Sequence, residues 1–212
     1  MGDSLSVGLD ALIPGPYCSA LNASRDAAAV AKLKEACAAA YKAHPDSCSH
    51  AVNAVIRAVL GLDMTAWPHR QANGIVAYMI QSTDWKEVTL DRAYELALQG
   101  VPVVGGKAED GGRNGHVIIV YPGLRKPRGG YSFTATDGTL KTMATKGSYP
   151  LAMSTSLGSW PGAKSDGSKT VYDPWGNDTA FALVKFWAPA KQAAAKADIS
   201  GAVRAKTGFG FG

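Results

Sequence analysis

The chain lacks the long apolar runs that membrane-spanning helices need. None of its apolar segments approaches about 20 residues, although 46% of its 212 residues are hydrophobic and only 18% are charged. This composition is typical of a globular protein with a sizeable core. Residues 1–16 have neither a basic beginning nor a long apolar stretch. We therefore expect synthesis in the cytoplasm without a Sec signal peptide, and a different export route if the protein acts elsewhere.

Dense basic blocks are also missing. The net charge of +5 is spread along the chain, and Arg125-Lys126-Pro127-Arg128, the only Lys/Arg cluster, has the composition of a turn. We therefore expect no nucleic-acid partner. The charge fits either a mildly basic solvated surface or attraction to an anionic polymer such as a cell-wall glycan.

Cysteine is scarce, with only Cys18, Cys37 and Cys48. Neither a CxxC motif nor a Cys/His ligand spacing occurs, so we expect no structural zinc and no cofactor. The odd number leaves at least one thiol free. Cys37 lies in an Ala-rich segment and is expected to be a small core residue. Whether Cys18 and Cys37 form a disulfide depends on the compartment and stays open.

Helix signals precede strand signals along the chain, which predicts an α+β fold with N-terminal helices packed on an antiparallel sheet. Residues 1–23 are expected to form an extended lead-in, residues 24–187 one domain, and residues 188–212 a helical tail. The expected helices cover 25–43, 48–60, 71–81 and 89–99. The expected strands cover 101–104, 116–121, 130–136, 148–154 and 179–187.

The helix expected over 48–60 begins with a cysteine. Asp46 or Ser47 is a suitable N-cap, and Gly61 is a suitable C-terminal stop. A helix N-terminus favours a thiolate through its unpaired N–H groups and its dipole. Because the apolar residues of this helix share one face with the thiol, the thiol is expected at the rim of the core. That face is formed by Cys48, Val52, Val55 and Val59.

A histidine begins the apolar strand expected over 116–121. Gly115 precedes His116 and is expected to leave room beside its ring, while the strand holds the backbone rigid. A general base must lie within about 3 Å of its proton donor, so rigid mounting matters. The order cysteine then histidine predicts Cys48 as nucleophile and His116 as general base. The alternative is that Cys48 is a buried structural residue.

The group that would orient the imidazole has two candidates. Asp137 is chemically suitable, but the dipeptide Asp137-Gly138 is also a strong turn signal. Ser154, near the end of a later strand, is the other option. The oxyanion is expected at the backbone N–H of Cys48, with a hydroxyl from Ser47 as an addition.

The tryptophans are candidates for lining a substrate groove, Trp67 and Trp85 first among them. The alternative is that they fill the core, and the same two interpretations apply to Trp160 and Trp175. The other histidines, His44, His50 and His69, are expected in loops or on the exposed side of a helix.

The segments 46–52 (Asp-Ser-Cys-Ser-His-Ala-Val), 100–106 and 115–120 (Gly-His-Val-Ile-Ile-Val) together resemble the papain-like NlpC peptidases of bacterial cell walls. The short form is most similar to the peptidoglycan amidase effectors of type VI secretion systems. Cys48 matches the family's nucleophile and His116 its base. Ser47 stands where the family has Asp or Asn, and His50-Ala51 stands where it has Gly-Phe. The third catalytic residue has no clear match.

This resemblance implies a papain-like fold and hydrolysis of an amide bond in the stem peptides or crosslinks of peptidoglycan. It implies secretion by the type VI route into the periplasm of a target cell, a cognate immunity protein, and contact with a component of the secretion apparatus. Two alternatives remain. One is a thiol-dependent acyltransferase on the same fold, and the other is a non-catalytic wall-binding module in which Cys48 is inert.

Overall fold

The computed structural model describes residues 16–111, 113–135, 137–158 and 160–194, and the side chains of its first helix from Asp26 onward. The described helices are α1 (Pro16–Ala43), α2 (Cys48–Leu60), α3 (Ala72–Gln81), α4 (Leu90–Leu98), α5 (Asp178–Phe181) and α6 (Ala190–Ala194). The described strands are β1 (Trp85–Val88), β2 (Val104–Lys107), β3 (His116–Arg128), β4 (Tyr131–Thr134), β5 (Leu140–Met143), β6 (Lys146–Ser154), β7 (Ser165–Thr170) and β8 (Lys185–Pro189).

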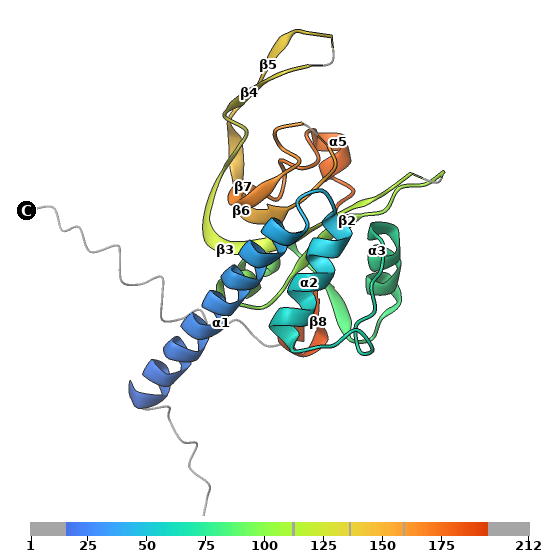
Figure 1. The fold of residues 1–212 in the computed structure, drawn as a ribbon. Helices are drawn as coiled ribbons and strands as arrows, with labels where there is room; N and C mark the ends of the chain where they lie inside the picture. Colours follow the sequence, from blue (N-terminus) through green and yellow to red (C-terminus); the bar gives the residue numbers. More distant parts are fainter. Residues whose placement is uncertain (1–15, 112, 136, 159, 195–212) are drawn as a thin grey trace, which may run out of the picture.

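Six of these strands form one antiparallel sheet in the order β1-β8-β2-β3-β6-β7, and β4 and β5 form a separate hairpin. The hairpin projects away from the rest of the molecule (Figure 1). The predicted α+β class is confirmed. Among the described residues, none of the helices combines the length and the apolar character needed to cross a bilayer.

Helices cover both faces of the sheet because β3 is apolar on both. Val117 and Ile119 belong to a core shared with α1, α2 and α3. Ile118 and Val120 belong to a second core that contains the buried face of α4. Alternate residues of a strand point to opposite faces, so an unbroken apolar run at the centre of a sheet can serve two helical layers. The prediction of a central strand at 116–121 is confirmed.

The helix that carries the cysteine has the predicted bounds. Ser47 is extended (φ −140°) and its side chain accepts a hydrogen bond from the backbone N–H of His50. Gly61 is left-handed (φ 68°) and its N–H caps the other end. Because these caps are chemically specific, the start of α2 is placed where the sequence predicts it.

The predicted terminal boundaries are wrong where the structure describes them. Helix α1 begins at Pro16, so residues 16–23 are helical and not extended. Strand β8 runs to Pro189 and Ala188 is fully buried opposite Lys86, so a tail beginning at residue 188 would cut a strand. Residues 190–194 are helical as expected. Residues 1–15 and 195–212 lie outside the described residues.

Three strands were missed, and two were misplaced. Strands β1, β5 and β7 have little apolar periodicity, and β7 (Ser165–Thr170) lies outside all the helices and strands that the sequence predicts. Strand β2 begins at Val104, where the predicted strand ends. The strand predicted over 179–187 instead begins in α5 and continues as β8. Strands β1 and β7 lie at the edges of the six-stranded sheet, and β5 lies in the two-stranded hairpin. These three strands form because they pair with a neighbouring strand, and their side-chain pattern does not indicate them.

Candidate active site

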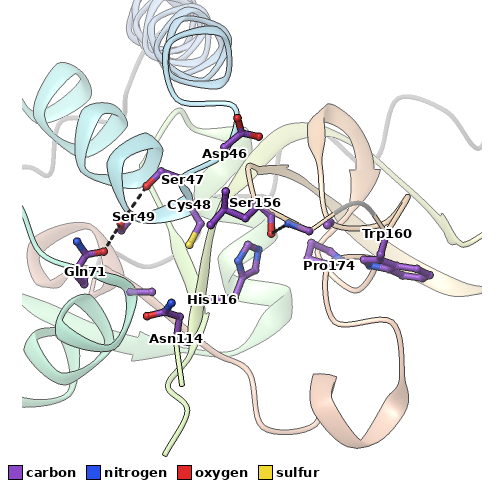
Figure 2. Close-up of a pocket in the computed structure, with 15 residues that line it drawn as sticks. Asp46, Ser47, Cys48, Ser49, Gln71, Asn114, His116, Ser156, Trp160 and Pro174 are labelled. Carbon is purple, nitrogen blue, oxygen red and sulfur yellow. Dashed lines mark hydrogen bonds between the residues drawn. The ribbon is translucent and has the colours of Figure 1, made fainter. Parts of the chain in front are cut away.

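A cavity of about 410 Å³ lies between the start of α2 and the start of β3. Cys48 and His116 both line it, so the structure brings together the two residues that the sequence pairs. In Figure 2 the Cys48 sulfur and the His116 ring lie next to each other at its centre. The remaining wall includes Asp46, Ser47, Ser49, Gln71, Asn114, Ser156 and Trp160.

The Cys48 thiol lies at the rim of the core, as predicted. It is half-buried and packs against the core formed by α1, α2 and α3. Burial raises the pKa of the thiol, and the backbone N–H groups of Val117, of Ser49 and of Cys48 itself act in the opposite direction. The Val117 N–H follows His116 directly in β3, so this contact places the sulfur at the beginning of that strand. The helix start alone suggested a thiolate, but here desolvation is the larger effect.

Ser154 holds the His116 ring from the side of Nε2. The two atoms His116 Nε2 and Ser154 Oγ are 3.0 Å apart. The Ser154 hydroxyl donates its only proton to the Ala163 carbonyl, at 2.7 Å. Ser154 Oγ must therefore accept from Nε2–H, and we assign the neutral ring as the Nε2–H tautomer. Nδ1 is then the nitrogen with a free lone pair.

The surroundings of His116 keep its ring neutral. Burial lowers the pKa of His116 to about 4. The Trp175 ring lies edge-on to the imidazole, with centroids 5.2 Å apart and planes at 74°. At neutral pH the site thus contains a thiol and a neutral imidazole. The ring has an unprotonated nitrogen, and its lowered pKa makes that nitrogen a weaker base than a solvent-exposed histidine.

Two walls of the cavity are tied together across its rim. The ammonium group of Lys164 lies 2.5 Å from the Asp46 carboxylate. The backbone N–H of Ser156 donates to the carbonyl of Pro45 at 3.3 Å. These contacts join the residues that precede α2 with the segment between β6 and β7. They hold the helix that begins with Cys48 against the wall that carries Ser154.

The hydroxyl of Ser47 is occupied as a helix cap. Its Oγ lies 2.7 Å from His50 Nδ1 and 3.4 Å from Ser49 Oγ, and Ser49 in turn donates to Gln71 Oε1 at 3.2 Å. Ser47 does line the cavity. Its role as an oxyanion donor, and that of the Cys48 backbone N–H, stay predictions.

Asp137 is not part of the site, and that prediction is wrong. It lies exposed in the turn between β4 and β5, where its carboxylate accepts from the N–H and the hydroxyl of Thr139, at 3.0 Å and 2.6 Å. These hydrogen bonds lower the pKa of Asp137. Gly138 is left-handed with φ 79°. The turn signal of Asp-Gly therefore explains this residue completely, and Ser154 is the candidate that touches His116.

Trp67 and Trp85 are core residues, so their predicted substrate-binding role is wrong. Their exposed fractions are only 2% and 4%, and their ring centroids lie 5.7 Å apart. The Trp67 indole N–H is bound to Asn53 Oδ1 at 2.8 Å. Trp160 lines the cavity instead. Sequence alone does not separate these cases, because neither Trp67 nor Trp160 lies in a helix or strand whose apolar pattern would show which way its side chain points.

The other histidines gather beside the site and not in it. The rings of His50 and His69 stack with centroids 4.1 Å apart, and the ring centroids of His44 and His50 lie 5.4 Å apart. None of the three lines the cavity. Within the described residues, no group of three or more His, Cys, Asp or Glu side chains has an arrangement that could hold a metal ion.

Several cavity residues were missed because they come from loops far apart in the chain. Gln71 precedes α3, Asn114 precedes β3, and Ser156 follows β6. Only Asn114 carries a local signal, since it lies two positions before His116.

No protein-family model matches the chain, and no curated protein matches it significantly.

Proposed function

We propose that this chain is a papain-like cysteine amidase that hydrolyses an amide bond in the peptide stems or crosslinks of peptidoglycan. One observation carries the proposal. A cysteine at a helix N-terminus and a histidine at a strand start line the same cavity, and the histidine is held through its far nitrogen by Ser154. Nucleophile, base and orienting group are the three parts that nucleophilic acyl transfer requires.

The reaction starts from the neutral pair. His116 Nδ1 accepts the Cys48 proton as the sulfur attacks the carbonyl carbon, and the carbonyl oxygen takes the negative charge. When the C–N bond breaks, the imidazolium gives its proton to the departing amine, which leaves a thioester on Cys48. Water, deprotonated by His116, then attacks the thioester and returns the thiol and a free carboxyl group.

The surroundings of the pair suit a peptide. The volume of about 410 Å³ lies within the range of roughly 300–1,000 Å³ that is usual for ligand sites. Its wall is rich in hydroxyl and carboxamide groups, which match the donors and acceptors of amide bonds. The assignment to peptidoglycan, the type VI route and the immunity protein rests on the sequence motifs, with the net charge of +5 as a fitting but unspecific addition.

The test is digestion of purified cell-wall sacculi, with the released fragments identified by mass spectrometry. We expect the wild-type protein to release stem fragments and Cys48→Ala to release none. Cys37→Ala is the matched control, because Cys37 is also a free thiol but is fully buried in the core. Undiminished release by Cys48→Ala would refute the proposal.

The same experiment separates the two alternatives. An acyltransferase on this fold would transfer the stem acyl group to an added amine or alcohol in preference to water. A non-catalytic wall-binding module would bind sacculi equally well with or without the Cys48 thiol and release nothing.

A further inference from the structure

The side chain of Asn73, on α3, makes four hydrogen bonds to the backbone of the loop that precedes His116. Its Nδ2 donates to the carbonyls of Glu109 and Arg113, at 3.1 Å and 2.9 Å. Its Oδ1 accepts from the N–H groups of Glu109 and Gly115, at 3.1 Å and 2.9 Å. A carboxamide offers two donors and two acceptor sites, so this side chain is saturated.

Two of these bonds flank a single residue, Asn114. The Arg113 carbonyl precedes it and the Gly115 N–H follows it, so Asn73 fixes the backbone on both sides of Asn114. The approach is so close that a Cβ on Gly115 would lie 2.3 Å from Asn73 Oδ1. The room beside Gly115 is thus used by Asn73 and not, as the sequence suggested, by the His116 ring.

The side chain held in this way is itself free. Asn114 is exposed and lines the cavity two positions before His116. Figure 2 shows its carboxamide below and to the left of the His116 ring. Among the described residues, no hydrogen bond or ion pair involves its side chain. A carboxamide presents a donor and an acceptor side by side, which is the pattern of a peptide amide in reverse.

We propose that Asn114 binds a peptide amide of the substrate next to the bond that is cut, and that Asn73 is the residue that positions it. This inference rests on the proposed amidase function and names the chemistry of one contact within it. The Asn73 carboxamide anchors the backbone on both sides of Asn114, whose own carboxamide is exposed and unpaired. Such an arrangement favours binding, because the backbone is already ordered before the ligand arrives.

The first experiment measures cleavage of a soluble disaccharide–peptide fragment prepared from sacculi with a muramidase. Loss of one neutral hydrogen bond predicts that Asn114→Ala lowers kcat/KM by roughly three- to tenfold, chiefly through KM. Asn114→Asp keeps the acceptor but loses the donor, so we expect a loss at least as large. Gln81→Ala, which removes an exposed carboxamide at the far end of α3, is the matched control and should change nothing.

The positioning role of Asn73 is tested by a double-mutant cycle. Asn73→Asp keeps both bonds to N–H groups and loses both donated bonds. If Asn73 acts through Asn114, adding Asn114→Ala to Asn73→Asp lowers kcat/KM by less than it does in the wild type. Thermal unfolding is recorded in parallel, because a merely structural Asn73 would lower the melting temperature and leave the two effects on kcat/KM additive.

Calorimetric binding of the same fragment to Cys48→Ala, with and without Asn114→Ala, separates this inference from the proposed function. Cleavage by the wild type together with unchanged kinetics and binding in Asn114→Ala overturns the role of Asn114 and keeps the amidase. Binding that depends on Asn114, without cleavage by the wild type, supports the contact and overturns the amidase. No binding and no cleavage overturns both.

Discussion

Replacing Ser154 by alanine is the sharpest test of how the His116 ring is held. Ser154 is 1% exposed, and its hydroxyl joins His116 Nε2 to the Ala163 carbonyl. Without it, a buried donor and a buried acceptor both lose their partner. At about 1 kcal/mol for each hydrogen bond, the free energy of unfolding should fall by about 2 kcal/mol. Losing the contact that selects the tautomer should cost roughly 1.4 kcal/mol of barrier, which is tenfold in kcat/KM.

The neighbouring strand offers a matched control. Ser165 pairs with Ser154 in the sheet, is 2% exposed, and donates its hydroxyl proton to the Ala152 carbonyl. Its oxygen also accepts from the N–H groups of Gly167 and Lys169. Ser165→Ala removes three hydrogen bonds, so the free energy of unfolding should fall by about 3 kcal/mol. The value of kcat/KM should stay unchanged, since no hydrogen bond joins Ser165 to His116.

Three measurements complete the test: denaturant unfolding of both variants, kcat/KM on the soluble peptidoglycan fragment, and nitrogen NMR of the imidazole. The wild-type ring should carry its proton on Nε2, and Ser154→Ala should show a mixture of tautomers. Equal kcat/KM for Ser154→Ala and Ser165→Ala would refute the assignment of Ser154 as the orienting residue.

Two further predictions follow from the site. Because burial lowers the pKa of His116 to about 4, kcat/KM should stay high at pH 5–6 and fall as the pH drops through about 4. In the unfolded chain the pKa of this histidine is about 6.5, so the unfolded state binds the proton first. The free energy of unfolding should therefore decline as the pH falls from about 6.5 to 4. A pH profile limited by a group near 6.5 would contradict this. Gly115→Ala would place a Cβ 2.5 Å from the Lys107 carbonyl oxygen and 2.3 Å from Asn73 Oδ1. We expect this variant to be destabilised by about 1–3 kcal/mol and to have a reduced kcat/KM. An unchanged melting temperature would contradict this packing.

The start of α2 shows what local sequence can specify. Ser47 caps the helix and Gly61 ends it, and both act through contacts within one turn of chain. His116 likewise begins β3, whose unbroken apolar run indicates a central strand. Local capping and an unbroken apolar run are properties of neighbouring residues, so the sequence alone placed Cys48 at the start of a helix and His116 at the start of a strand.

The rest of the site depends on contacts between distant segments. Asp137 and Ser154 were both candidates from the sequence, and only the folded sheet brings Ser154 Oγ to 3.0 Å from His116 Nε2. Trp67 and Trp160 are each followed by a proline in the sequence. Trp67 is nevertheless buried in the core, whereas Trp160 lines the cavity. The pKa of Cys48 also depends on the tertiary structure. Burial in the fold raises it, while the backbone N–H groups at the helix start, which the sequence predicts, lower it.

The amino-acid sequence by itself determined the elements that carry Cys48 and His116, because helix caps and the apolar pattern of a central strand act over a few neighbouring residues. Only the tertiary structure decided that Ser154 contacts the His116 ring, that Trp85 lies in the core, and that Asn73 anchors the loop around Asn114. These outcomes depend on strand register and on packing between segments far apart in the chain, and no local pattern encodes that information.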